Sequence, residues 1–324
     1  MKLGAIGSGG FSTGVLYPIL QNLKTVNLHT VVSSNGVNAV NTARQFGFAN
    51  AGTSFEDLLE NREVTATLIA TPHHLHTTQV IASLEAGKDV FVEKPLATTT
   101  DELNEVITAY KKNPGNLMVG FNRRFSPAAL NVKKHLVQSE TPAMYVYRIN
   151  AGFIPKESPL QDDTIGKGRI IGEACHFIDL ISFLSGATPQ TVFAEGVEFT
   201  TSKFLTQDNV NMTMKLSDGS TAVIVYTASG GAGLPKEALE VHCAGSSYVI
   251  DDFKTAMKYH NSKMTKLWSG AQDKGHKAEL AAFATLQRGS EEARAIAEAG
   301  FNATQVTLAV VESLRTNQIV KLSA

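Results

Sequence analysis

The first third of the chain alternates short apolar runs with helical patterns, and this alternation constrains the fold more than any other feature. The apolar runs cover 2–7, 28–34, 65–71, 89–93 and 117–121, with helical patterns at 11–23, 38–47, 76–87 and 99–113. Strands that alternate with helices form right-handed β-α-β units, which build a parallel sheet covered on both faces. We therefore predict a doubly wound α/β domain over residues 1–121.

After a helix at 127–138 the pattern changes to longer segments in which apolar and polar residues alternate. These segments cover 143–154, 191–199, 209–216, 220–229, 237–245 and 247–253. The turn sequences SDGS and AGSS join neighbouring segments, as is typical of antiparallel hairpins. Helical patterns lie at 172–186, 276–287 and 291–316, before a last short strand at 318–322. We predict a second, α+β domain over residues 122–324, built on a mostly antiparallel sheet.

Composition excludes several classes of protein. The 324 residues are 43% hydrophobic and 18% charged, as in soluble globular proteins, with a net charge of -1. No basic field exists to attract nucleic acid or an anionic membrane, so we predict neither as a partner. The start of the chain does not resemble a secretory signal, and Cys175 and Cys243 lack the spacing of a zinc site or a disulfide framework. We expect a cytoplasmic protein.

The stretch AIGSGGFSTG places three glycines between the first strand and the first helix. Gly7, Gly9 and Gly10 let the backbone turn tightly and approach a pyrophosphate, whose charge the helix N-terminus favours. Ser12 stands where a third glycine is common, and it is small enough for the helix to pack on the strand. The position of the pattern after the first strand predicts a dinucleotide site that includes Phe11, whereas an isolated match is also explained by an ordinary β-α turn.

The end of the second predicted strand lacks the acidic residue that commonly binds the adenosine ribose. Ser33, Ser34 and Asn35 stand there instead. Without a carboxylate nothing repels a 2′-phosphate, and the hydroxyls could donate to one, but no arginine sits beside them. Both NAD and NADP remain open as the cofactor, with a slight preference for NADP.

The stretch ATPHHLH ends the third well-formed apolar run, where Pro72 stops the strand. Ligands of such sheets bind outside the carboxyl ends of the strands, so we predict that Thr71, Pro72, His73 and His76 line the nicotinamide end of the crevice. No carboxylate or thiol joins the histidines at ligand spacing, and we predict no metal site. For His74, a polar helix start explains the residue equally well.

The stretch VFVEKPLATT runs a strand into an acid, a base and a proline. Glu93 and Lys94 fall at the carboxyl end of a parallel strand, in the same crevice, and Pro95 is expected to hold Lys94 extended. A lysine beside the nicotinamide can hydrogen-bond a substrate hydroxyl or carbonyl and stabilise a developing alkoxide. The alternative is a solvated strand end.

Together, GSGGFS, ATPHHLH and VEKPLATT resemble the glucose-fructose oxidoreductase/inositol dehydrogenase/MocA (Gfo/Idh/MocA) family, and GKGRIIGEACHFIDL resembles its catalytic-histidine helix. The resemblance implies a Rossmann domain and an open-faced sheet domain that binds substrate and forms a homodimer or homotetramer through the sheet. It implies hydride transfer between NAD(P) and a secondary alcohol or ketone of a sugar, cyclitol or related molecule. GFNRRFSPAAL and RINAGFIP look more narrowly like the reductase half of bi-domain oxidoreductases.

By motif match, the resemblance gives Lys94 the role of catalytic lysine and His176 that of proton donor or acceptor. Histidine suits this task because its ordinary pKa is about 6.5. Asp179, one helical turn later, is expected to orient His176 or to bind a substrate hydroxyl. Many members carry an aspartate four residues before the histidine, where this chain has Gly172, and whether Glu173 replaces it is left open.

The resemblance also suggests residues near the domain junction. Asn122 and Arg123 are expected to approach the cofactor, and Arg124 to tie the domains together, with surface salt bridges as the alternative. Gln161 and Asp162 are candidates for contacting substrate. The missing aspartate motivates a second hypothesis, a dinucleotide-binding regulator or scaffold without turnover. A third is an enzyme that reduces an unrelated double bond in the same crevice.

Overall fold

The structure is a computed structural model that describes residues 1–137, 141–162, 164–199 and 204–322. The chain divides into two compact units, Met1–Gly120 with His276–Thr304, and Phe121–Gly275 with Gln305–Ala324. The first unit thus includes a helical segment from the end of the chain in addition to the N-terminal residues expected for it. No helix of the described ranges is both long enough and apolar enough to cross a membrane.

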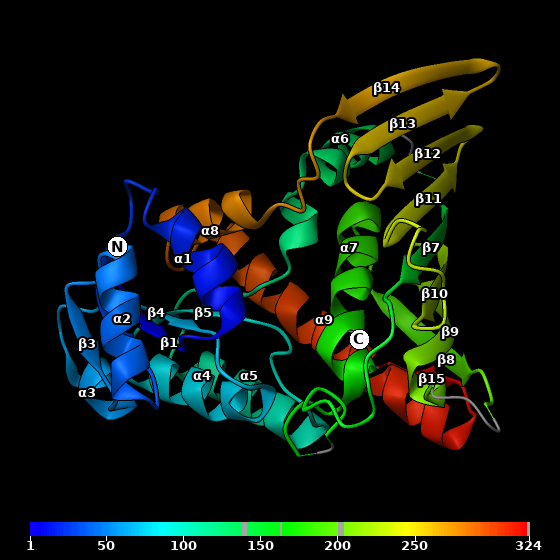
Figure 1. The fold of residues 1–324 in the computed structure, drawn as a ribbon. Coiled ribbons are helices and arrows are strands. Elements are labelled where there is room, and N and C mark those ends of the chain that lie inside the picture. The colour runs from blue at the N-terminus through cyan, green and yellow to red at the C-terminus, as the bar shows by residue number, and fades with distance from the viewer. Residues whose placement is uncertain (138–140, 163, 200–203, 323–324) are drawn as a thin grey trace. The chain divides into compact units, whose positions relative to one another are not determined.

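The first unit is built on a six-stranded parallel sheet with the strand order β3-β2-β1-β4-β5-β6. Figure 1 labels β1, β3, β4 and β5 of this sheet. The strands are β1 (Lys2–Ile6), β2 (Asn27–Val32), β3 (Asn50–Gly52), β4 (Ala66–Ile69), β5 (Asp89–Val92) and β6 (Leu117–Val119). The sheet centre is apolar because both faces are covered, as the continuous burial of β4 shows. The predicted doubly wound α/β fold is confirmed.

Helices cover both faces of this sheet. They are η1 (Ser12–Leu16), α1 (Tyr17–Leu20), α2 (Gly36–Phe46), α3 (Phe55–Glu60), η2 (His73–Leu75), α4 (His76–Glu85), α5 (Thr100–Lys112), α8 (His276–Thr285) and the first part of α9 (Glu291–Thr316). Local sequence signals fix several helix starts. Asn35 caps α2, Ser54 caps α3, and Thr99 forms a reciprocal capping box with Glu102 at the start of α5.

The segment 276–304 belongs to the first unit because its apolar side chains pack on the parallel sheet and its helices. Phe283 of α8 meets Phe91 of β5 edge to face, with ring centroids 5.6 Å apart, and Phe301 of α9 meets Tyr110 in the same way at 5.5 Å. At Gly300 a Cβ would lie 2.8 Å from the Val119 side chain, so α9 lies close against β6. These long-range contacts carry no signal in the local sequence pattern.

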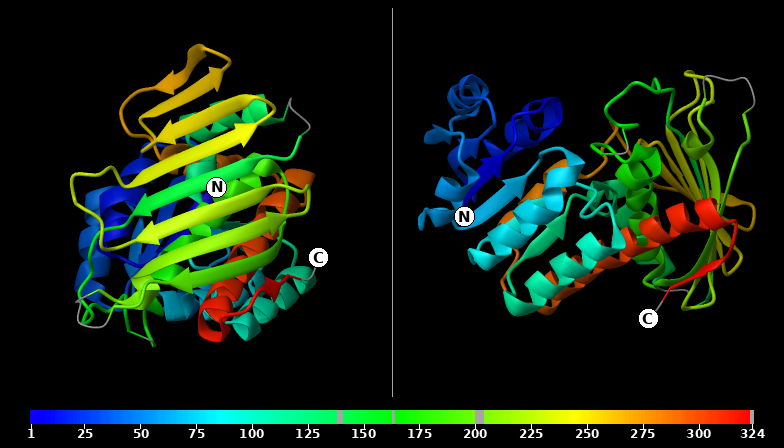
Figure 2. Two further views of the ribbon diagram at one scale, coloured as in Figure 1. Left: turned by 90° about the vertical axis from the view of Figure 1, so that its right-hand side faces the viewer. Right: turned by 90° about the horizontal axis from the view of Figure 1, so that it is seen from below.

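The second unit is built on a nine-stranded sheet with the order β14-β13-β12-β11-β7-β10-β9-β8-β15. Its strands are β7 (Met144–Asn150), β8 (Pro189–Gly196), β9 (Asn209–Leu216), β10 (Thr221–Thr227), β11 (Glu237–Cys243), β12 (Ser246–Asp251), β13 (Thr255–His260), β14 (Lys263–Ser269) and β15 (Val320–Lys321). Only β7 and β10 pair in parallel among the described strands of this sheet. The predicted mostly antiparallel sheet is confirmed, and Figure 2 shows it face-on in its left view.

One face of this sheet packs on helices of the same unit, which are η3 (Asn122–Phe125), α6 (Pro127–Leu136), η4 (Ile170–Ala174) and α7 (Cys175–Ser185), with η5 (Thr206–Asp208) preceding β9. Phe177 of α7 packs edge to face on Tyr147 of β7, at 5.2 Å between centroids, and lies 6.1 Å from the ring of Tyr226 of β10. The side chains on the opposite face alternate with these, as the period of a strand requires.

Two pairs of elements were not predicted from the sequence. Strand β3 and helix α3 each have six or fewer residues, too few for a clear period. The hairpin β13–β14 is rich in lysine, threonine and histidine, and most residues of β14 are exposed, so its apolar alternation is weak.

Candidate active site

The glycine-rich turn after β1 has one position that only glycine fits and two that are open. Gly7 has φ +114°, and a Cβ there would lie 2.4 Å from the carbonyl oxygen of Ala70. A Cβ on Gly9 or Gly10 would meet no atom within 4 Å. The turn therefore presents open backbone immediately before a helical segment, an arrangement that fits the pyrophosphate of a dinucleotide.

The next two residues differ in exposure. The Phe11 side chain is 45% exposed, and its ring meets the imidazole of His276 edge to face at 5.9 Å. Ser12 is buried where the helical segment begins. The burial of Ser12 is compatible with close packing of the helical segment on the strand, while Phe11 is a candidate for covering a bound dinucleotide.

The end of β2 presents hydroxyl groups. The Ser8 hydroxyl donates to Ser33 Oγ at 2.8 Å, and Ser34 is exposed. The amide oxygen of Asn35 accepts from the backbone N–H of Val37 at 2.9 Å and caps α2. Asn35 therefore caps the helix start, and Ser34 is an exposed side chain at this strand end.

The loop after β4 carries the predicted Thr71, Pro72, His73 and His76. The Thr71 hydroxyl donates to Gln79 Oε1 at 2.6 Å, and His73 is half-buried. The His76 ring is fully buried, with Nε2 at 2.9 Å from the Thr71 carbonyl oxygen. Pro72 is exposed, Thr71 and His73 are half-buried, and His76 is the buried member of this group.

Glu93 and Lys94 directly follow the strand β5. The Glu93 backbone N–H donates to the carbonyl of Ile69 at 2.8 Å, which is the last ladder bond to β4. The Glu93 carboxyl group lies against Gly120, where an added Cβ would be 3.0 Å from Oε1. Burial raises the pKa of Glu93 to about 7, although the positive charge of Lys94 acts in the opposite direction. Lys94 is half-buried, and the peptide bond to Pro95 is cis. An acid that titrates near neutral pH thus stands beside the predicted catalytic cation.

These residues of the first unit all follow the carboxyl ends of β1, β2, β4 and β5, which are neighbouring parallel strands. They therefore share one edge of the sheet, the edge at which ligands of this fold bind. Lys94 belongs to the first unit and His176 to the second, so their meeting stays a prediction.

In the second unit, His176 lies in the first turn of α7 and is buried, with its ring edge to face on Phe121 at 5.9 Å. Asp179 lies one turn later, and its carboxylate accepts from Arg124 through both oxygens, with Arg124 Nε at 2.9 Å from Oδ2. This ion pair ties η3 to α7 inside the second unit. The predicted contacts of Asp179 with His176 or substrate, and of Arg124 between the domains, stay predictions.

Glu173, one turn before His176, is held by three partners. Its carboxylate contacts the Lys236 ammonium, accepts from the Tyr226 hydroxyl at 2.5 Å, and lies 3.2 Å from the Arg169 guanidinium. Burial disfavours its charge, but these partners lower the pKa of Glu173 to about 2. The group therefore stays ionised and joins η4 to the sheet, which is not the environment of a general base that takes a proton near neutral pH.

Arg123 forms a buried ion pair with Glu237, the first residue of β11. The guanidinium donates to both carboxylate oxygens at 2.7 and 2.8 Å, and Lys274 and Tyr147 complete the cluster at 2.7 and 2.6 Å. Burial opposes ionisation of Glu237, yet Arg123 and Lys274 hold its pKa well below the usual range. Asn122 beside it donates to the Lys274 carbonyl at 2.8 Å. The cofactor contacts expected of Asn122 and Arg123 stay predictions.

Gln161 and Asp162 both have local partners. The buried Gln161 amide donates to Asp208 Oδ2 at 2.6 Å. Asp162 is exposed, and its Oδ1 accepts from the backbone N–H groups of Thr164 and Ile165 at 2.7 and 3.0 Å. Asp162 therefore stabilises its own turn, and the predicted substrate contacts of both residues are not tested by these bonds.

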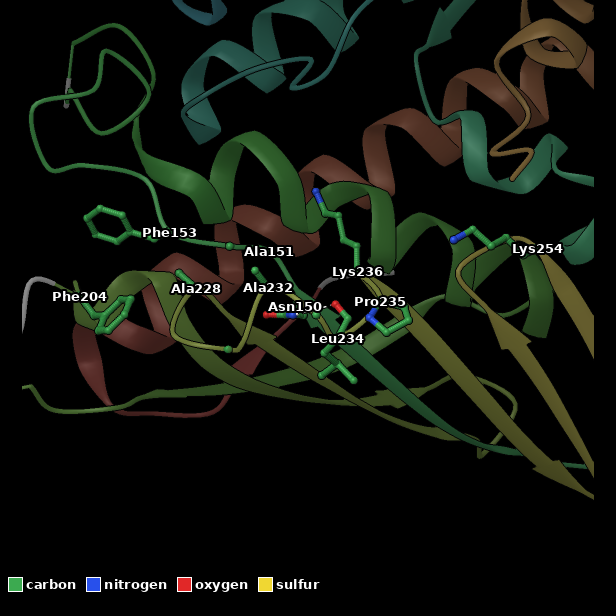
Figure 3. A pocket seen from close by; sticks show the side chains of 13 residues that line it. Asn150, Ala151, Phe153, Phe204, Ala228, Ala232, Leu234, Pro235, Lys236 and Lys254 are labelled. Carbon is green, nitrogen blue, oxygen red and sulfur yellow. Dashed lines mark hydrogen bonds between the residues drawn. The ribbon is translucent and has the colours of Figure 1, made fainter. Parts of the chain in front are cut away.

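A pocket of about 680 Å³ lies in the second unit at one end of the sheet (Figure 3). The loop between β10 and β11 forms much of its wall, and the Asn150 amide holds this loop by donating to the carbonyls of Gly231 and Leu234 at 2.8 and 3.0 Å. Phe153 and Phe204, with ring centroids 5.6 Å apart, form an aromatic side. Because Lys236 also lines the pocket and binds Glu173, the pocket adjoins the turn that precedes His176.

The sequence analysis did not single out the pocket residues Lys236, Phe153 and Phe204, nor Arg169 and Tyr226. The one local signal was the loop sequence GGAGLPK between two predicted strands, since such loops often carry function. Within the described ranges no three His, Cys, Asp or Glu side chains gather closely enough to hold a metal ion.

Comparison with known proteins adds a family to this geometry. Residues 1–121 match the family model described as the oxidoreductase family with NAD-binding Rossmann fold, and residues 145–249 match the GFO/IDH/MocA C-terminal domain. A levoglucosan dehydrogenase of Pseudarthrobacter phenanthrenivorans is 32% identical over 163 residues, 48% of this chain and 42% of that protein. A myo-inositol 2-dehydrogenase of Thermotoga maritima is 27% identical over 235 residues, 72% of this chain and 66% of that protein.

Among solved structures, a levoglucosan dehydrogenase in complex with NADH is similar over 100% of this chain and 99% of that chain, with a TM-score of 0.81 and 22% identity. At this identity the likeness shows the fold. The chain matches between about two fifths and two thirds of the length of the two curated relatives. The two domain matches cover most of the chain between them, and it belongs to the Gfo/Idh/MocA oxidoreductase family, whose N-terminal domain is an NAD-binding Rossmann fold.

Proposed function

We propose that the chain is an NAD(P)-dependent oxidoreductase that transfers a hydride between nicotinamide and a secondary alcohol or ketone of a sugar, cyclitol or related small molecule. The observation that carries the proposal is the position of Lys94, which follows β5 at the same sheet edge as the open glycine turn. Relatives named as levoglucosan and inositol dehydrogenases support this substrate class.

The proposed mechanism divides proton handling between the two units. NAD(P), when bound, supplies or accepts the hydride. The Lys94 ammonium donates a hydrogen bond to the substrate oxygen and stabilises its alkoxide character. His176 takes the hydroxyl proton during oxidation and returns it during reduction, which is worth roughly 100- to 10,000-fold in rate. Glu173 is held ionised by Lys236, so the proposal assigns the proton transfer to His176.

The test is a set of kinetic measurements. Sugars, inositols and their keto forms are screened with NAD and NADP by the absorbance of the reduced cofactor. Lys94→Ala and His176→Ala should each abolish turnover while the dissociation constant of the cofactor stays within about threefold of wild type. The exposed Lys111→Ala and His260→Ala serve as matched controls and should leave kcat unchanged. Retained activity in both Lys94→Ala and His176→Ala would contradict the proposal.

A regulator or scaffold that binds dinucleotide without turnover is the second candidate. Two observations favour it: Gly172 stands where many members of the family carry an aspartate, and the neighbouring Glu173 is held by Lys236 and Tyr226. Tight dinucleotide binding with no turnover over the whole panel would support this candidate. Turnover of a substrate with an activated double bond would support the third hypothesis.

For the cofactor we propose NADP over NAD. The support is the end of β2, where Ser33 and the exposed Ser34 offer hydroxyls and no carboxylate repels a 2′-phosphate. A family relative that binds NADH shows that the family also accepts the other cofactor. Isothermal titration should give a lower dissociation constant for NADP, and Ser34→Asp should weaken NADP binding at least tenfold and NAD binding little. Tighter binding of NAD by the wild-type protein would contradict the preference.

We propose that the chain assembles as a homodimer or homotetramer through the open face of the nine-stranded sheet. On this face Val223 and Val225 of β10 alternate with the buried Ile224 and Tyr226, and Val146 of β7 lies directly beside Val223. A stripe of valines at the centre of a sheet face is suited to association with a second copy.

Sedimentation velocity tests the assembly. Val225→Lys should convert the oligomer to monomers, because it would bury an unpaired charge in the interface. Val37→Lys, at an exposed position on α2, is the matched control and should leave the oligomer intact. An unchanged sedimentation coefficient for Val225→Lys would contradict the proposal.

We place the substrate in the pocket of the second unit, where Phe153 and Phe204 offer an aromatic face for a sugar ring and Lys236 a hydrogen-bond donor. Phe204→Ala should then raise KM more than it lowers kcat. An unchanged KM would argue for another substrate site.

The cytoplasm remains the proposed location. Cys175 and Cys243 are buried and form no disulfide, as is typical of a reducing compartment.

A further inference from the structure

The imidazole of His76 lies between two backbone carbonyls that belong to different loops. Nδ1 is 2.7 Å from the carbonyl oxygen of Pro95, and Nε2 is 2.9 Å from that of Thr71. The side chain is 0% exposed. One carbonyl belongs to the loop after β4 and the other to the loop after β5. Burial lowers the pKa of His76 to about 4, so near pH 7 the ring is neutral and carries a single N–H. We assign this N–H to Nδ1, whose contact to Pro95 is the shorter one, so the ring ties the start of α4 to the loop after β5 beneath the surface.

The ring lies where the strand ladder ends. The β4–β5 ladder closes with the bond from the Glu93 N–H to the Ile69 carbonyl. Two residues later Pro95 has no N–H, so the backbone of β5 has no donor there to continue the ladder. The imidazole supplies a hydrogen-bonding group at this point, and Pro95 directly follows Lys94. The ring therefore fixes the backbone from which the Lys94 side chain extends.

We propose that His76 is a positioning residue for Lys94. Its imidazole holds the Pro95 carbonyl against the loop after β4 and so sets where the Lys94 ammonium is presented. His76 acts through these loops from beneath the crevice, without touching the substrate itself. The inference rests on the proposed function, in which Lys94 donates to the substrate oxygen.

An apolar side chain of similar size separates this role from simple packing. His76→Leu keeps the core filled but donates no hydrogen bond, whereas His76→Gln keeps an amide N–H. A displacement of about 1 Å at a reacting group can cost roughly 100-fold in rate. We expect His76→Leu to lower kcat by about that factor with the cofactor dissociation constant changed less than about threefold, and His76→Gln to recover at least about a tenth of wild-type kcat.

A double-mutant cycle tests the dependence on Lys94. In single-turnover measurements on the Lys94→Ala background, His76→Leu should change the residual rate by less than about threefold, because the group it positions is already absent. The same fold-loss in both backgrounds would overturn the proposal. So would a loss expressed through the cofactor dissociation constant.

A crystal structure of His76→Leu supplies a readout that does not depend on turnover. The Pro95 carbonyl and the Lys94 ammonium should move by about 1 Å or more relative to the wild-type protein, and less in His76→Gln. Unmoved positions in His76→Leu would overturn the proposal. If the wild-type protein turned over no substrate of the panel, the proposed function would fall, while this structure would still decide whether His76 holds the loop.

Discussion

Glu93, which directly follows β5, carries a carboxyl group whose charge the structure disfavours. Burial raises its pKa to about 7 from 4.5, against the opposing charge of Lys94. Between about pH 4.5 and 7 the folded chain therefore keeps a proton that the unfolded chain has released, and stability falls as the pH rises through this window. The difference amounts to about 3 kcal/mol when the titration is complete.

Glu93→Gln should remove this pH dependence, since the amide does not titrate. We predict that urea unfolding finds the variant more stable than the wild type by up to about 3 kcal/mol at about pH 8, with a difference near zero at about pH 4.5. Stability curves that run parallel for the two proteins from about pH 4.5 to 8 would show that burial does not hold the proton on Glu93.

Gly7 illustrates a residue whose role the sequence predicted and the structure explains. Its φ is +114°, and a side chain there would begin with a Cβ only 2.4 Å from the carbonyl oxygen of Ala70. Gly7→Ala should lower the free energy of unfolding by roughly 1–3 kcal/mol, from backbone strain alone, in chemical denaturation. Gly10→Ala, with nothing within 4 Å, should stay within about 0.5 kcal/mol of wild type and weaken dinucleotide binding instead. Equal stability losses would contradict this distinction.

Other residue roles could not be predicted, because they depend on partners far along the chain. The burial of Glu93 depends on Gly120, and the bonds of His76 depend on Pro95. The local pattern places Glu93 and His76 at strand ends, where a crevice contact is a reasonable hypothesis. It carries no information on whether the side chain points into that crevice or beneath it.

At the scale of elements, the buried pair Arg123–Glu237 holds η3 to the start of β11. Their side chains are 7% and 1% exposed. Arg123→Met would remove the guanidinium that offsets the cost of burying the Glu237 carboxylate. We predict a loss of roughly 3–5 kcal/mol in the free energy of unfolding. Lys2→Met removes an exposed bridge to Glu63 and should cost less than about 1 kcal/mol.

Chemical denaturation and cofactor titration of both variants separate the possible roles of Arg123. A large stability loss with little change in cofactor affinity supports a structural role inside the second unit. A large loss of cofactor affinity with unchanged stability would instead support the contact predicted from the sequence.

The elements that the sequence predicted well are those with a strong period and a clear boundary residue. Helix α5 begins at Thr99 with its capping box, and α2 ends at Gly47 in the left-handed conformation. The hairpin β13–β14 lacked such signals, because few of its residues are buried. Pairing with β12 extends the sheet to it, and pairing between strands is a tertiary property.

At the scale of the whole molecule, the segment 276–304 completes the nucleotide-binding unit. A fragment of residues 1–121 should therefore fail to fold alone, because Phe91 and Val119 would lose the cover of Phe283 and Gly300. The same fragment joined by a flexible linker to 276–304 should unfold cooperatively in circular dichroism and bind dinucleotide. Cooperative unfolding of the shorter fragment would contradict the division into units described above.

A change from β-α alternation to long alternating strands was visible in the sequence near residue 121. The return of the chain to the first unit was not, because a helical pattern does not say which sheet its apolar face covers. The same limit applies to the site. Lys94 and His176 were identified from motifs on separate units, and no local pattern reports the distance between them.

The structure of a ternary complex with NADP and a substrate or its keto form would show whether Lys94 and His176 act on the same substrate oxygen. The account predicts that the Lys94 ammonium and a ring nitrogen of His176 both lie within about 2.6–3.2 Å of the oxygen on the carbon that faces the nicotinamide. A complex in which either group points away from that oxygen, with the substrate turned over nonetheless, would contradict it.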